Sequence, residues 1–211
     1  KLLRLRQKRA QPVTDKKYIT SWNALVGIGL IMAYRHCNNS LAKIKAELLF
    51  NNILNKHYQQ GRLYHSSYES KLQYGEFLED YATMLLFASY LYEETGEYKN
   101  LIEIWYWKLA EFYDQHWIEN KIPDFTSVPA QTFDHPIPSS TSVAEMAQLR
   151  ASIILGKEYA PAKYKQPLQH DFHNLMVFMN NWHIIHTPHN IEWKHLPANS
   201  MQIKDIKIQD C

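Results

Sequence analysis

Two adjacent carboxylates, Glu79 and Asp80, are the side chains of this sequence that best suit acid–base chemistry. At helical spacing Asp80 falls between Phe77 and Met84, on an apolar stripe. A carboxylate in an apolar setting often has a raised pKa and serves as a general acid. Glu79 falls on a different face. The alternative is structural, because carboxylates in a first helical turn complement the helix dipole, and spacing alone favours this alternative.

Polar residues also surround a helix start predicted near residue 21. Asp15, Trp22 and Asn23 could bind a polar ligand there, with the indole ring of Trp22 as a stacking surface. In the competing interpretation, which the local spacing favours, Trp22 is a core anchor and Asn23 is a residue of the first helical turn. The pattern therefore gives three candidate ligand-binding residues and a structural explanation for two of them.

Hydroxyl side chains precede another predicted helix, in residues 138–142 (Pro-Ser-Ser-Thr-Ser). Hydroxyls before a helix N-terminus suit an anion or a sugar hydroxyl, and Ser139 is the candidate contact. The alternative is a capping box between Ser142 and Glu145, which needs no ligand. The chain contains no Gly-x-Ser-x-Gly turn, so we expect no serine nucleophile.

The histidines and cysteines predict neither a metal site nor a disulfide framework. His170 and His173 are three residues apart, but no His-Glu-x-x-His or similar motif is present. Cys37 and Cys211 form no Cys-x-x-Cys pair. We therefore expect no metal and no cofactor.

The charge pattern excludes several classes of partner. A net charge of +2 is too small to indicate nucleic-acid binding, and the basic residues 1–9 alternate with Leu without interleaved aromatics, as on a solvated strand face. No apolar run is long enough to span a bilayer, and no apolar segment of a signal peptide follows the basic start. We expect no nucleic-acid or membrane partner and a cytoplasmic location.

Composition favours a mostly α-helical chain. Only 6 of the 211 residues are Gly, whereas sandwiches and barrels need many tight turns. Helical spacing predicts helices over residues 21–37, 41–60, 76–95, 98–116 and 142–156, and one within 161–182. Short strands are expected at residues 63–68 and 122–126, a short strand or extended arm at residues 3–5, and a strand or a last helical turn at residues 203–208. Short links between successive helices require antiparallel pairs, so the expected architecture is a repeated helix hairpin.

Several motifs together resemble a known family. In chain order they are Arg9 and Pro12, residues 15–17 (Asp-Lys-Lys), residues 20–23 (Thr-Ser-Trp-Asn), residues 61–63 (Gly-Arg-Leu), residues 77–82 (Phe-Leu-Glu-Asp-Tyr-Ala) and residues 138–142. Their order and spacing resemble the thioredoxin-domain-containing family typified by spermatogenesis-associated protein 20, over residues 5–164. Each motif alone is weak, but together they are fairly specific.

This resemblance implies part of an (α/α)6 toroid, the fold of N-acylglucosamine 2-epimerases and many glycosidases. Residues 1–182 would form a partial toroid of about six helices, and residues 183–211 a C-terminal extension. The thioredoxin-like domain that precedes the toroid in the family is absent from this chain. A partial toroid would also leave an apolar edge exposed, which predicts self-association, a protein partner or a missing segment.

The resemblance implies a ligand site at the mouth of the toroid. Asp80 or Glu79 would be the general acid or base, and the ligand contacts would be Asp15, Trp22, Asn23, Tyr81 and Ser139. The family pattern is interrupted at Lys16, Ala24 and residues 140–141, which indicates a degenerate site. The leading hypothesis is a domain that binds or processes a sugar-like small molecule. A non-catalytic interaction domain and an accessory domain to a thioredoxin-like partner are the alternatives.

Overall fold

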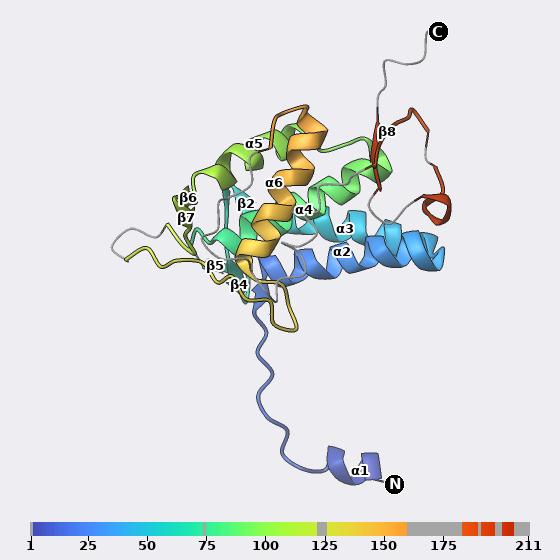
Figure 1. Ribbon diagram of the computed structural model, residues 1–211. Coiled ribbons are helices and arrows are strands. Elements are labelled where there is room, and N and C mark those ends of the chain that lie inside the picture. Colours follow the sequence, from blue (N-terminus) through green and yellow to red (C-terminus); the bar gives the residue numbers. More distant parts are fainter. Residues whose placement is uncertain are drawn as a thin grey trace.

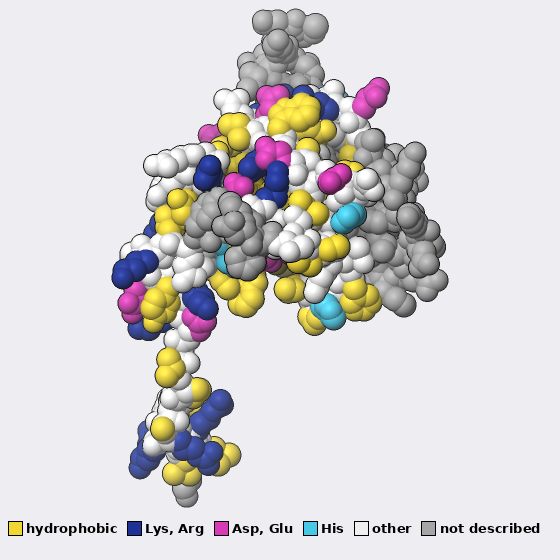
Figure 2. Space-filling view, turned by 90° about the vertical axis from the view of Figure 1, so that its left-hand side faces the viewer, with side chains coloured by type: hydrophobic (Ala, Val, Ile, Leu, Met, Phe, Trp, Pro, Cys, Tyr) yellow, Lys and Arg dark blue, Asp and Glu magenta, His cyan; other side chains and the backbone are white. Residues whose placement is uncertain are grey.

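The structure is a computed structural model that describes residues 2–73, 75–121, 126–159, 183–189, 191–196 and 200–204. In these residues the α-helices are α1 (Leu2–Gln7), α2 (Thr20–Cys37), α3 (Ser40–His57), α4 (Leu78–Thr95), α5 (Lys99–Ala110) and α6 (Ser140–Leu155). Figure 1 shows α2 to α6 packed together, while α1 lies at the end of an extended N-terminal arm. Lys and Arg side chains gather on that arm, whereas acidic and basic side chains are mixed on the helical body (Figure 2).

The helices pack as antiparallel pairs around a central helix. Only Asn38 and Asn39 separate α2 from α3, and three residues separate α4 from α5, so each pair must reverse direction. Helix α4 packs against α2, α5 and α6, with its largest contact to α6. The predicted all-α class, with helix hairpins and short strands in the connections, is confirmed.

Helix α4 is central because its sequence is apolar on nearly every side. Its Phe87 ring meets Phe50 of α3 edge to face, with 5.1 Å between ring centroids. On the α2 side, a Cβ at Gly27 would lie only 2.1 Å from the Phe87 ring. Glycine at this position therefore lets α2 approach α4 closely enough to bring their first turns together.

Short antiparallel strands cover the end of the helical layer where α2 and α4 begin. Strand β1 (Tyr18–Ile19) pairs with β4 (Ser66–Tyr68), which pairs with β5 (Lys71–Gln73). Strands β2 (Tyr58–Gln59) and β3 (Arg62–Leu63) form one hairpin, and β6 (Tyr113–Asp114) and β7 (His116–Trp117) form another. The backbone N–H of Leu78 donates to the carbonyl of Glu119 at 2.9 Å, which ties the segment after β7 to the start of α4.

The C-terminal described segments lie at the opposite end of the helical layer. Strand β8 (His183–His186) pairs in parallel with β9 (Ser200–Ile203), and a 3-10 turn, η1 (Trp193–His195), lies between them in sequence and contacts α2. Strand β9 packs on α4. The division into a domain over 1–182 and an extension over 183–211 stays a prediction.

Two of the predicted elements were wrong. Residues 2–7 form a helix and not a strand, because Leu, Arg and Gln favour helix and the exposed arm offers no sheet to join. The helix predicted over 98–116 ends at Ala110, and the β6–β7 hairpin follows, turning at Gln115 with φ of 58°. The helix predicted within 161–182 and most of the strand predicted over 122–126 lie outside the described residues.

The predicted helix starts were right to within two residues, but the residues that cap the helices differ from those expected. Asn39, in the link before α3, caps this helix, since its side chain accepts from the backbone N–H of Ala42. Helix α2 has no side-chain cap.

Of the described helices, none has the length and apolar character needed to cross a bilayer. The cytoplasmic location stays a prediction.

Candidate functional site

The first turns of α2, α4 and α6 meet around a small cavity of about 20 Å³. Polar and apolar side chains from all three helix starts line it: Ser21, Trp22, Leu25, Glu79, Thr83, Ile137, Pro138, Ser140 and Val143. Three helix N-termini at one place also direct the positive ends of their dipoles toward it. The tertiary structure therefore brings together two of the segments singled out in the sequence, residues 77–82 and 138–142, with the start of α2.

Asp80 is fully buried beside this cavity and has two hydrogen-bond partners. Its Oδ1 accepts from the backbone N–H of Ser21 at 3.1 Å, and its Oδ2 lies 2.9 Å from Nδ1 of His65. Burial raises the pKa of Asp80 to about 6, although the hydrogen bond and charge of His65 oppose the rise. This burial agrees with the place of Asp80 on the apolar stripe, and its catalytic role stays a prediction.

Glu79 reaches the same histidine from a less buried position. Its Oε1 lies 3.6 Å from Nδ1 of His65, and its side chain is 31% exposed. Burial and the negative charge of Asp80 raise the pKa of Glu79 to about 7, against the attraction of His65. The hydrogen bond to Asp80 in turn raises the pKa of His65, against the effect of burial. Protons can therefore move on and off this cluster near neutral pH, as acid–base chemistry requires.

Glu119 adds a third carboxylate to the site. It accepts a hydrogen bond from Oγ of Ser140 at 2.8 Å, so it connects the segment after β7 to the start of α6. Its negative charge raises the pKa of both Glu79 and Asp80. The cluster therefore has more acidic groups than the adjacent pair in the sequence indicates.

Trp22 takes a different position from the one that the local spacing favours, whereas Asn23 takes the expected one. Trp22 lines the cavity with 58% of its surface exposed, so it is not a core anchor and its indole is accessible to a ligand. The side-chain amide of Asn23 donates to the carbonyl of Ile19 at 2.7 Å, which is a first-turn contact. The structure therefore supports a ligand contact at Trp22 more strongly than at Asn23.

The remaining predicted ligand contacts have structural partners. The phenolic oxygen of Tyr81, which is fully buried, accepts from the backbone N–H of Leu63 at 3.1 Å. The hydroxyl of Ser139 caps α6 by accepting from the backbone N–H of Ser142 at 3.2 Å, so the predicted capping box at Ser142 was wrong. Asp15 is exposed and contacts Lys17. A ligand-binding role for these three residues stays a prediction.

Sequence reasoning missed His65 and Glu119. His65 lies between β3 and β4, fourteen residues before Glu79, and the backbone N–H of Thr20 donates to its carbonyl at 2.9 Å. Glu119 follows the β6–β7 hairpin, where the sequence had predicted only the end of a helix. Neither residue belongs to a periodic pattern, so only the folding of these connections could reveal them.

His65, Glu79 and Asp80 could also hold a cation. Each offers one ligand atom, and these atoms lie within 4.8 Å of one another. Carboxylate oxygens and an imidazole nitrogen are common ligands of divalent metals. A divalent metal ion is therefore a competing occupant of this cluster.

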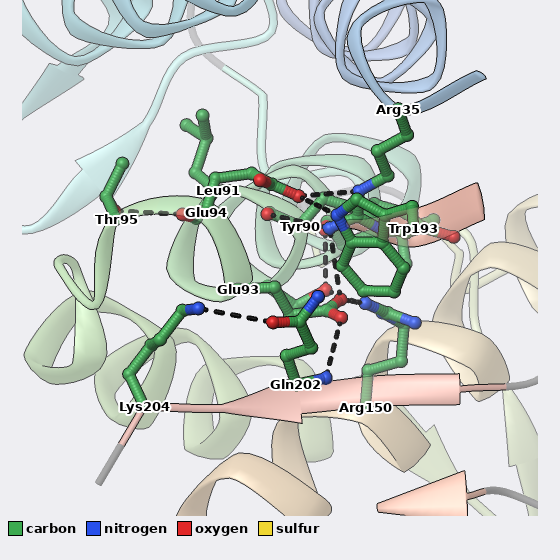
Figure 3. Close-up of polar contacts among 12 residues, drawn as sticks. Arg35, Tyr90, Leu91, Glu93, Glu94, Thr95, Arg150, Trp193, Gln202 and Lys204 are labelled. Atoms are coloured by element: carbon green, nitrogen blue, oxygen red, sulfur yellow. Dashed lines mark hydrogen bonds and ion pairs between the residues drawn. The ribbon is translucent and has the colours of Figure 1, made fainter. Parts of the chain in front are cut away.

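A second cluster of charged residues lies where the same three helices end (Figure 3). Glu93 pairs with Arg150, and its Oε1 lies 3.5 Å from Nη2 of Arg35. Glu94 accepts from Nε of Arg35 at 2.6 Å and from the indole N–H of Trp193 at 3.0 Å. Each acid is therefore matched by an arginine.

This second cluster is enclosed by aromatic rings and by β9. The guanidinium of Arg35 lies 3.8 Å from the ring centroid of Trp193, and that of Arg150 lies 3.9 Å from the ring centroid of Tyr90. The backbone N–H of Gln202 donates to Glu93 at 3.1 Å. Burial lowers the pKa of Arg150 to about 10, so this arginine is still charged at neutral pH. These contacts describe a structural ion cluster.

The comparisons with known proteins identify a fold and no family. No family model matches the chain, and no curated protein matches it. Among solved structures, it is similar to cellobiose 2-epimerase from Spirochaeta thermophila DSM 6192, with a TM-score of 0.57 and 14% sequence identity. The match covers 70% of this chain and 41% of that chain, so this chain spans less than half of the epimerase.

At 14% identity the likeness shows the fold alone. The antiparallel hairpins α2–α3 and α4–α5, together with α6, form part of an α/α toroid like that of the epimerase. The predicted fold class, including the toroid, is confirmed. The function must be argued from the residues of the site.

Proposed function

We propose that this chain binds a carbohydrate-like small molecule at the cluster of His65, Glu79 and Asp80, and processes it by acid–base chemistry. The observation that carries the proposal is the convergence of two carboxylates on one imidazole, at 2.9 and 3.6 Å. A polyol offers hydroxyl donors to such acceptors and an apolar face to an exposed indole such as that of Trp22. The fold likeness to a protein named as a cellobiose epimerase supports the substrate class by analogy only.

The positions of the two acids suggest different roles. Glu79 lines the cavity and has a pKa of about 7, so it is the group that would exchange a proton with the ligand. Asp80 is fully buried and bonded to Nδ1 of His65, so it would position the imidazole. The family pattern is interrupted at Lys16 and Ala24, so we propose ligand binding as the first property to test and turnover as the second.

Thermal unfolding in the presence of sugars tests the proposal. A ligand at 100 times its dissociation constant adds about 2.7 kcal/mol, which shifts the melting temperature by several degrees for a chain of this size. We expect such a shift with wild-type protein and its loss in Asp80→Asn and Glu79→Gln. The matched control is Glu97→Gln, an exposed acid just beyond the opposite end of α4. A shift that survives in both site variants would contradict the proposed site.

A non-catalytic interaction domain is the second candidate, and the outer surface of α3 favours it. Leu41, Ile44 and Leu48 are each more than half exposed and lie along one side of this helix. Such a stripe suits self-association or a protein partner. Sedimentation that shows a stable dimer, together with no sugar-induced shift, would favour this function over the first.

The assignment of this chain to a particular family is also a proposal. The resemblance to the thioredoxin-domain-containing family rests on the motifs in residues 5–164, and no family model matches the chain. A role as an accessory domain to a thioredoxin-like partner depends on that resemblance.

A further inference from the structure

The cavity under Trp22 has a surplus of acidic groups on its polar side. Glu79 lines it directly, and Asp80 and Glu119 are close enough to raise its pKa by their charge. The positive charge that opposes them comes from His65, with the dipoles of the helix starts. A ligand group that brings a positive charge would therefore be favoured here over a neutral or negative one.

The hydroxyl of Ser21 is an independent sign of a missing ligand. Ser21 is 1% exposed and lines the cavity. By hydrogen-bond geometry its Oγ has no partner among the described residues, although it lies close enough to Glu79 to lower the pKa of that acid as a hydrogen bond would. Buried hydroxyls nearly always have a partner, so this oxygen is available to accept from a ligand donor.

The size of the cavity restricts what can enter it. Its volume of about 20 Å³ exceeds the roughly 10–15 Å³ that a single water requires. One small head group therefore fits, whereas a sugar ring must lie outside. The exposed indole of Trp22 at the rim offers that outer part a flat apolar surface.

We propose that the ligand carries a protonated primary amine that enters this cavity and donates hydrogen bonds to Glu79 and Ser21. An ammonium group has three donors and no acceptor, which suits a cavity whose polar lining consists of a carboxylate and hydroxyls. The rest of the ligand, a polyol or sugar, packs on Trp22. This inference rests on the proposed function, because it names the substrate class of the same site.

A matched pair of ligands tests the inference. Glucamine and glucitol differ by one amine in place of one hydroxyl, and each is titrated into the whole chain by calorimetry at pH 7. Because a hydrogen bond to a charged group contributes more than a neutral one, we expect glucamine to bind at least tenfold more tightly than glucitol. Glu79→Gln and Ser21→Ala should each reduce that ratio, while Glu97→Gln should leave it unchanged.

The other outcomes separate this inference from the proposed function. Equal affinity for the two ligands would contradict the proposed amine group of the ligand but leave the proposal of polyol binding in place. Binding of neither ligand, by protein with native circular dichroism, would overturn both. Binding of Mn²⁺ alone at His65, Glu79 and Asp80, without binding of glucamine, would overturn the amine in favour of a metal ion.

Discussion

The two ends of the same three helices hold charged clusters of opposite design. Where α2, α4 and α6 end, Glu93 and Glu94 are matched by Arg35 and Arg150, which are nearly fully buried. Where these helices begin, Glu79 and Asp80 share one imidazole, Glu119 is near enough to raise their pKa values, and Glu79 lines a cavity. The helix dipole favours the acids near the N-termini and the arginines near the C-termini, but it opposes Glu93 and Glu94 in the last turn of α4, which depend on their arginine partners.

The difference separates a structural cluster from the candidate functional one. At the C-terminal end the charges are paired and enclosed, and Arg150 keeps its charge at neutral pH. At the N-terminal end, burial and mutual repulsion raise the pKa values of Glu79 and Asp80 into the neutral range, which destabilises their charged forms. Such unfavourable arrangements are typical of sites that a ligand completes.

The largest expected effect is at the C-terminal end. Glu93→Gln removes the acid that contacts Arg35, Arg150 and the backbone of Gln202. Loss of one partner of a buried pair leaves the other charge uncompensated, so we expect a loss of about 3–5 kcal/mol in the free energy of unfolding. Chemical denaturation measures this change.

The control for that variant replaces both partners. Glu93→Leu combined with Arg150→Met removes a matched pair of charges and restores apolar packing, so it should recover part of the lost stability. A single Glu93→Gln variant as stable as wild type would show that this cluster does not hold the helix ends together.

The pH dependence of stability should come from the N-terminal end. Folding raises the pKa of Asp80 from 3.8 to about 6 and that of Glu79 from 4.5 to about 7, so the folded state binds more protons between these values. Their contribution is complete below about pH 4 and is lost as the pH rises through about 6 and 7. We expect a loss of about 3–4 kcal/mol between pH 5 and pH 8, seen as a lower melting temperature.

A double variant sharpens this prediction. Asp80→Asn with Glu79→Gln should flatten the curve of melting temperature against pH, whereas Glu97→Gln should leave its slope unchanged. Arg150 at the other end has a pKa of about 10 and stays charged throughout this range. A slope that persists in the double variant would place the titrating groups elsewhere.

The smallest effect is expected at Ser139, where a cap and a ligand contact can be told apart. Ser139→Ala removes the side chain that accepts from the backbone N–H of Ser142, so it should cost about 1 kcal/mol. Ligand affinity should not change, because the hydroxyl of Ser139 caps α6 and does not contact the ligand. Ser139→Asp, which preserves the cap, should restore stability, and a selective loss of affinity in Ser139→Ala would instead support a ligand contact.

Much of the fold could be predicted from the sequence, because helix periodicity is a local property. The starts of α2, α4 and α6 were placed to within two residues, and Gly96 and Gly156 end their helices at φ of 76° and 64° as expected of glycine stops. The helix at residues 2–7 was mistaken for a strand, because alternation over four residues does not decide between the two. The end of α5 was missed because the hairpin after it depends on partners elsewhere in the chain.

The candidate site was only half predictable. Glu79 and Asp80 could be selected because a carboxylate on an apolar stripe is unusual in any sequence. His65 and Glu119 could not, since each lies in a connection without periodicity. The exposure of Trp22 could not be predicted either, because helical spacing identifies an apolar face without showing whether another element covers it.

The sequence by itself determined most of the helices and their antiparallel pairing, since these follow from local spacing and short links. Tertiary structure alone decided which ends of α2, α4 and α6 meet, and so which charges face one another. It gave Glu93 and Glu94 arginine partners, and it gave Glu79 and Asp80 one histidine and a cavity. The physical reason is that the pKa and the reactivity of a carboxylate depend on its neighbours in space, and residues 65, 79 and 119 become neighbours only when the chain folds.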